Sequence, residues 1–135
     1  MAKNLNASGL GYVLHFRHAL PSLCWSILIF GLHAIPGSDL DLNDWTGLFH
    51  FDKLMHLAMF AVLSSSTFIA LGKSGSIRRY KFWAISGLAF FGVSLELAQD
   101  LWFLEREASV MDLIADVLGV FVGRLAFRLI YGCWN

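Results

Sequence analysis

The stretch VMDLIADVLGVFVG, residues Val110 to Gly123, decides how the rest of the chain can fold. It is apolar enough to enter a lipid bilayer, yet it contains two aspartates, Asp112 and Asp116, followed by Gly119 and Gly123. Intervals of four, three and four residues place these four positions on one face of a helix. A stripe of carboxylates and glycines is unfavourable against lipid, so we expect this face to pack against other helices.

The composition indicates a membrane protein. Of the 135 residues, 57% are hydrophobic and 15% are charged, whereas soluble proteins average roughly 45–50% and about 25%. A soluble helical protein with a very apolar core is the alternative, but a chain this short has too little interior to bury so many apolar side chains. Ten basic and ten acidic residues balance each other, so the net charge indicates no nucleic-acid partner.

The two cysteines give little functional information. Cys24 and Cys133 lie in or beside apolar segments near opposite ends of the chain, without a CxxC pair. This spacing predicts buried thiols rather than a disulfide or a metal site.

Four apolar segments predict four membrane helices, at about residues 20–35, 51–71, 82–103 and 110–131, because about 20 residues cross the hydrocarbon core. A basic start followed by an apolar block is also typical of a signal peptide. We favour a retained first helix, since Trp25 and Phe30 are bulky and the segment supplies a packing partner for the others. No repeat or linker divides the chain, so residues 1–135 are predicted to form a single domain.

The charges between these segments predict the orientation. The N-terminus, the turn Gly72 to Lys81 and the C-terminal end are basic, whereas the loops at 38–51 and 104–109 are acidic. The positive-inside rule then places both termini in the cytoplasm. The predicted fold is therefore all-α, a polytopic four-transmembrane-helix bundle with N-in and C-in topology.

This topology brings polar residues from three spans into the outer half of the membrane. Asp52 and His56 are four residues apart, and Glu96 and Gln99 share one helical face. An ionisable residue at the membrane centre costs about 2.5–3.5 kcal/mol, so such residues usually have a function. The resulting candidate binding residues are Asp52, Lys53, His56, Glu96, Gln99, Arg106, Asp112 and Asp116.

Simpler roles exist for some of these positions. Lys53 is also typical of an interfacial cation, Asp112 of a helix N-terminus, and the pair Gly119 and Gly123 of close helix packing. Serines and a threonine in the inner half are expected to hydrogen-bond to their own backbone or to a neighbouring helix; these are Ser64, Ser65, Ser66 and Thr67. Four histidines near interfaces or in loops are given no role: His15, His18, His33 and His50.

Four motifs now follow one another along the chain: Asp52-Lys53-x-x-His56-x-x-x-Phe60, Glu96-x-x-Gln99, Arg106-x-x-Ser109-x-x-Asp112 and Gly119-x-x-x-Gly123. In this order and spacing they resemble the VanZ-like family of small bacterial membrane proteins, over about Trp25 to Gly123. The resemblance implies four membrane helices in the bacterial inner membrane and a link to low-level resistance to teicoplanin, a glycopeptide antibiotic. It implies no reaction. The chain has Asp116 where the family often has Asn, and Leu104-Glu105 where the family commonly has Pro-Gly.

Three functions remain open at this point. The first is binding of a lipid-linked or cell-wall headgroup, with Lys53 and Arg106 as cationic contacts. The second is a membrane enzyme that uses acid and base groups, for which the candidates are His56, Glu96, Asp112 and Asp116. The third is a structural subunit of a larger membrane complex. No cofactor or metal is predicted, because no two-His spacing is present, although one His with several carboxylates leaves a divalent cation as a minor alternative.

Overall fold

The structure, a computed structural model, describes residues 3–34, 49–102 and 109–132. These residues form four helices, α1 (Lys3–His33), α2 (Phe49–Lys73), α3 (Ile77–Trp102) and α4 (Val110–Tyr131), and no strand occurs among them. The all-α prediction is therefore confirmed. The bounds of α4 coincide with the predicted segment, and the bounds of α2 and the end of α3 lie within two residues of prediction.

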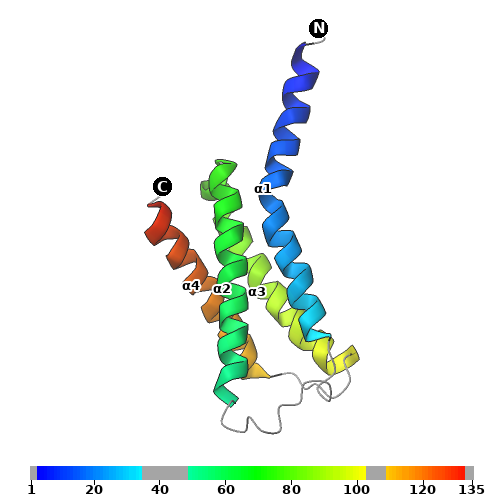
Figure 1. The fold of residues 1–135 in the computed structure, drawn as a ribbon, viewed down its shortest axis with the longest axis vertical. Helices are drawn as coiled ribbons and strands as arrows, with labels where there is room; N and C mark the ends of the chain where they lie inside the picture. Colours follow the sequence, from blue (N-terminus) through cyan, green and yellow to red (C-terminus); the bar gives the residue numbers. More distant parts are fainter. Residues whose placement is uncertain (1–2, 35–48, 103–108, 133–135) are drawn as a thin grey trace.

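The first helix is longer than predicted. It begins at Lys3 rather than near Leu20 and continues through Pro21. The helix changes direction part-way along its length (Figure 1), as expected where proline removes one backbone hydrogen bond. The hydrophobic segment predicts only the apolar half of this helix. A helix can continue into polar sequence where no helix-terminating residue follows, and hydrophobicity does not detect that part.

The basic segment at 72–81 was predicted as a turn, but only its first part is one. Gly75 has φ +66°, the left-handed conformation that glycine tolerates best. The carbonyl of Ser76 then accepts hydrogen bonds from the backbone N–H groups of Arg79 and Tyr80. The cations from Arg78 onward therefore lie on the first turns of α3 and not in a loop.

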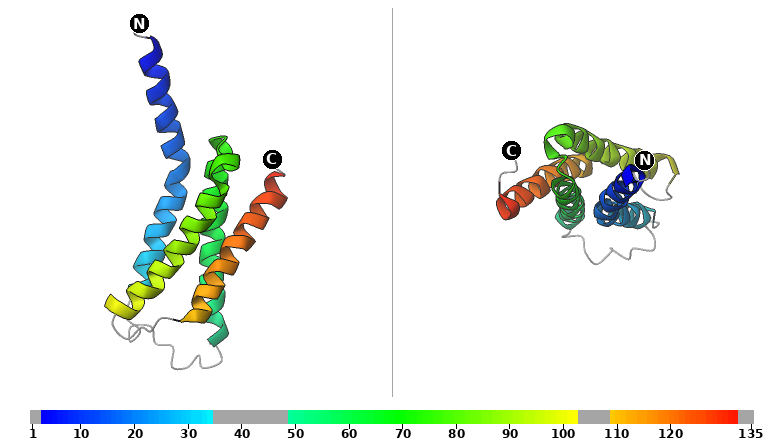
Figure 2. Two further views of the ribbon diagram at one scale, coloured as in Figure 1. Left: turned by 180° about the vertical axis from the view of Figure 1, so that it is seen from behind. Right: turned by 90° about the horizontal axis from the view of Figure 1, so that it is seen from above.

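The helices form a bundle in which α2 contacts each of the other three. Figure 1 shows the end of α1, the start of α2, the end of α3 and the start of α4 together at one end of the molecule. The turn between α2 and α3 lies toward the opposite end, as do the start of α1 and the end of α4 (Figures 1 and 2). Figure 2 also shows the N-terminal part of α1 extending beyond the other helices.

The closest helix contact is between α2 and α4. A Cβ atom added to Gly119 would overlap the carbonyl oxygen of Leu57, and one added to Gly123 would overlap that of Ala61. The two backbones thus approach as far as glycine allows. The hydroxyl of Ser64 donates to the carbonyl of Val120 across this contact, at 2.7 Å.

The other predicted hydroxyl contacts are also present. Ser65 donates to the carbonyl of Gly123 at 3.0 Å. Ser66 and Thr67 donate to the carbonyl of Leu63 in their own helix, at 2.9 and 2.8 Å. The expectation that these groups bond to their own backbone or to a neighbouring helix is confirmed.

The apolar core lies between α1, α2, α3 and α4 and is small. Its buried members are Ile29, Met59, Phe60, Leu63, Leu88, Leu95 and Val120. Trp25 packs against this core and donates from its indole nitrogen to the carbonyl of Met59, at 2.9 Å.

Much of the apolar surface faces outward. Trp83 and Leu129 each have 76% of their surface exposed, and Phe90 has 71%. Within the described residues, α2 over Asp52–Lys73 and α3 are long and apolar enough to cross a membrane. The prediction of a buried thiol at Cys24 is wrong, because its side chain lies on this outward surface; Cys133 lies outside the described residues.

Candidate functional site

The polar residues of three helices meet at the end of the bundle where α2 and α4 begin and α3 ends. Five of them are buried, although they are up to 60 positions apart in sequence: His56, Glu96, Gln99, Asp112 and Asp116. Lys53 is partly exposed and Asp52 is exposed. We refer to Asp52, Lys53, His56, Glu96, Asp112 and Asp116 as the polar cluster.

Two ion pairs join α2 to α4. Lys53 Nζ lies 3.4 Å from Asp112 Oδ1. His56 Nδ1 lies 3.0 Å from Asp116 Oδ1, with only 4% and 1% of the two side chains exposed. When the Asp116 carboxylate is ionised it only accepts hydrogen bonds, and Nδ1 of His56 then carries the proton in this contact. The other ring nitrogen, Nε2, is then the one available for further chemistry.

Glu96 joins α3 to the start of α4. Its Oε2 accepts a hydrogen bond from the backbone N–H of Ser109, at 2.8 Å. Ser109 is the N-cap of α4, and its hydroxyl accepts from the N–H of Asp112. In a capping box, the acid three residues after the cap would bond the cap N–H. Here Glu96 of another helix takes that role, so the Asp112 carboxylate stays available to Lys53.

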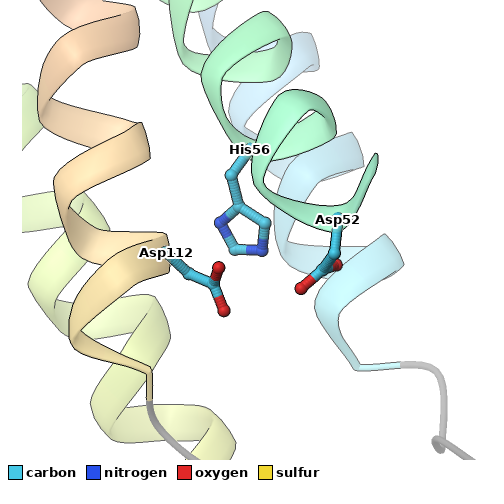
Figure 3. A group of neighbouring side chains, drawn as sticks. All are labelled: Asp52, His56 and Asp112. Atoms are coloured by element: carbon cyan, nitrogen blue, oxygen red, sulfur yellow. The ribbon is translucent and has the colours of Figure 1, made fainter. Parts of the chain in front are cut away.

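The outer part of the polar cluster is more open. Figure 3 shows the His56 ring pointing into the space between the carboxylates of Asp52 and Asp112. One ligand atom from each of these three residues lies within 4.8 Å of the other two. Because Asp52 is exposed, a ligand could reach His56 from this side.

Gly92 of α3 packs against the inner part of the polar cluster. A Cβ atom at this glycine would lie 3.0 Å from Asp116 Oδ2, so the missing side chain makes room for the carboxylate. Within the described residues, Glu96 Oε1 and Asp116 Oδ2 are buried without a hydrogen-bond partner. Such atoms are costly, so these two oxygens are the most conspicuous polar groups of the site.

Among the predicted site residues that the structure describes, Gln99 is not joined to the polar cluster. Gln99 is buried on α3 beyond Glu96, and among the described residues no hydrogen bond connects it to the others. Arg106 lies outside the described residues.

His33 was given no role from the sequence, but it lies beside the site. Its ring packs edge-on against His56, with centroids 4.8 Å apart and an interplanar angle of 76°. Its Nδ1 lies 2.8 Å from the carbonyl oxygen of Ile29, which fixes the ring. The predicted membrane depth of His33 was a usable signal. His33 lies near the end of the first apolar segment, on the side of the membrane where His56 begins the second.

Two cavities among the described residues lie away from the polar cluster, toward the other end of the bundle. The larger, of about 490 Å³, is lined by Arg17, His18, Pro21, Ser66, Ile69 and Lys73. The smaller is lined by Ile69, Gly72, Lys73, Phe127 and Tyr131.

Comparison with known proteins gives no match: no family model matches the chain, and neither a curated protein nor a solved structure is significantly similar to it.

Proposed function

We propose that this chain is a VanZ-like, multi-pass protein of the bacterial inner membrane that binds the polar headgroup of a lipid-linked or cell-wall intermediate. The observation that carries the proposal is the buried polar cluster. His56, Glu96 and Asp116 come from three helices, yet all meet at one end of the bundle. Groups of this kind are expensive inside a membrane and usually mark a functional site.

Four crossings with N-in and C-in topology agree with the shape of the bundle. The shortest helix, α4, has 22 residues and so is about 33 Å long, enough for about 30 Å of hydrocarbon. Its aspartates, Asp112 and Asp116, are buried in the bundle, while Arg128 is exposed near the helix end, where a long cation can reach the interface. The outward side of α1 is apolar, with Ile27 64% exposed.

The charges suit a headgroup that carries both hydroxyl or amine donors and a phosphate. Carboxylates such as Asp52 and Asp112 accept hydrogen bonds from sugar hydroxyls or from an ammonium group. Lys53, beside Asp112, is a point cation of the kind that contacts phosphate. Under the proposed topology, this set of groups faces the outer leaflet, where cell-wall intermediates are used.

Teicoplanin susceptibility tests this proposal in cells. A susceptible host that expresses the chain should become less sensitive, and His56→Ala and Glu96→Gln should each return sensitivity to that of the empty vector. Asp100→Asn is the matched control, because Asp100 is an exposed acid on the same helix as Glu96. If His56→Ala and Arg106→Ala both leave the phenotype unchanged, the proposal fails.

A membrane-embedded acid/base enzyme is the second candidate, and one contact favours it. The Asp116 carboxylate holds His56 through Nδ1, which orients Nε2 as a proton acceptor in the way that a carboxylate orients a catalytic histidine. Purified protein should then convert a lipid-linked substrate, and His56→Ala should abolish the turnover. If headgroup binding occurs without turnover, the enzyme proposal is excluded.

The third candidate, already open from the sequence, is a structural subunit of a larger membrane complex. In that case the polar cluster only holds the helices together. Isosteric neutral substitutions, Glu96→Gln with Asp116→Asn, would then leave both folding and phenotype unchanged.

A further inference from the structure

Three buried side chains in the inner part of the polar cluster are typical ligands of a divalent cation. One ligand atom from each of His56, Glu96 and Asp116 lies within 4.8 Å of the other two. Their exposed fractions are 3%, 5% and 0%. Each comes from a different helix, so only the tertiary fold brings the three together.

Each carboxylate in this set has one oxygen in use and one left over. Glu96 Oε2 accepts from the Ser109 N–H, and Asp116 Oδ1 is paired with His56. Glu96 Oε1 and Asp116 Oδ2 are buried and, within the described residues, have no hydrogen-bond partner. Since the described residues supply no donor to these two oxygens, the oxygens can donate their lone pairs to a cation.

The charge of the buried groups points the same way. Glu96, Asp112 and Asp116 are three buried carboxylates, and Lys53 is paired with Asp112. With these four described groups ionised and His56 neutral, three negative charges and one positive charge leave a net charge of −2. A divalent cation would bring this set to neutrality, which matters because uncompensated charge is costly inside a membrane.

The spacing suits direct coordination. Ligand atoms that lie about 2.0–2.2 Å from a common ion are roughly 3–3.5 Å apart at tetrahedral or octahedral angles. His56 Nδ1 and Asp116 Oδ1 lie 3.0 Å apart, so these two side chains are already close enough to share one ion. Imidazole nitrogen with carboxylate oxygen suits zinc better than magnesium or calcium.

We propose that His56, Glu96 and Asp116 bind one divalent transition-metal ion, for which Zn²⁺ is the best match. Three protein ligands leave a position open for water or another oxygen ligand. If the headgroup proposal also holds, a phosphate oxygen is the natural occupant of that position. Metal binding itself does not depend on that function, because it is a property of the protein alone.

A second set of ligands, Asp52, His56 and Asp112, meets the same distance criterion. The structure favours the inner set over this outer one for two reasons. Asp52 is exposed, so water already solvates its carboxylate. Asp112 is paired with Lys53, which would repel an approaching cation.

Zinc binding to the purified full chain, with its affinity tag removed, tests the proposal. Calorimetry in detergent should give one Zn²⁺ per chain. Glu96→Gln and Asp116→Asn should each weaken binding at least tenfold, and both keep an oxygen for the contacts to Ser109 and His56. Asp100→Asn and Asp52→Asn should change it less than threefold. Circular dichroism without metal checks that each variant is folded.

Three results would overturn the proposal. The first is an absence of saturable Zn²⁺ binding to the unmodified chain, which would mean that protons rather than a metal neutralise the carboxylates. The second is binding that Asp52→Asn abolishes while Glu96→Gln and Asp116→Asn retain it. The third is binding that none of the variants weakens. None of these results affects headgroup binding, which is measured separately with metal chelated.

Discussion

Asp116 is fully buried, and its hydrogen bond with the buried His56 joins α4 to α2 inside the site. Asp116→Ala leaves the imidazole N–H without its acceptor and opens space beside Gly92. We expect a loss of about 1–3 kcal/mol in the free energy of unfolding, the cost of an unmade buried hydrogen bond. Asp116→Asn, which keeps an oxygen at the same place, should lose clearly less. Denaturant titration in micelles gives both values, and equal losses would contradict this role of the contact.

Ser64 provides a residue-scale test away from the site. Its hydroxyl donates to the Val120 carbonyl at 2.7 Å in a fully buried position. Ser64→Ala should therefore lower the free energy of unfolding by about 0.5–1.5 kcal/mol, the net value of one such bond. Ser94→Ala is the control, because the Ser94 hydroxyl donates within its own helix, to the Phe90 carbonyl. A larger effect at Ser94 than at Ser64 would contradict the assignment.

The sequence predicts which residues belong to the site more readily than it predicts the contacts that they make. Asp116 and Glu96 stood out because a carboxylate in an apolar helix is rare and expensive. That Glu96 bonds the N-cap of α4 could not be predicted, since it depends on how α3 ends beside α4. His33 was overlooked because a single histidine at the end of an apolar segment carries no local pattern.

At the element scale, the glycines of α4 decide how closely it packs on α2. Gly119→Ala and Gly123→Ala would each drive a methyl group into a backbone carbonyl of α2, which cannot move without shifting the helix. We expect each change to cost about 1–3 kcal/mol of stability, as overpacking generally does. Thermal unfolding in detergent measures the loss.

Gly87 on α3 is the matched control for these substitutions. A Cβ atom there meets no other atom within 4 Å, and the residue is exposed. Gly87→Ala should therefore be neutral or slightly stabilising, because alanine favours helix more than glycine does. The packing account would be wrong if Gly87→Ala were as damaging as Gly123→Ala.

The bounds of a helix are predictable where the helix ends at the same residues as its apolar segment. The ends of α4 followed from the apolar stretch after Ser109, which caps it. The start of α1 and the start of α3 were missed, because the helices continue into polar or basic sequence at Lys3 and Ile77. Hydropathy detects the part of a helix that suits a membrane core, and it cannot detect where the backbone hydrogen bonding begins.

At the scale of the whole molecule, the orientation of the bundle is open to a direct test. In a variant without Cys24 and Cys133, we expect Asp100→Cys to react with a membrane-impermeant maleimide in intact cells. Arg78→Cys, at the opposite end of α3, should react only after the cells are broken. Both positions are exposed, so burial cannot account for a difference between them. The reverse pattern would contradict the N-in and C-in topology.

The central claim is that the polar cluster binds a ligand and does not serve only to hold the helices together. The most direct test compares the wild-type chain with the double variant Glu96→Gln/Asp116→Asn for binding of a labelled lipid-linked cell-wall precursor in nanodiscs. The substituted side chains match the originals in size and can still accept from Ser109 and His56. We predict at least a tenfold weaker affinity with normal folding. Wild-type affinity in the folded double variant would contradict the claim.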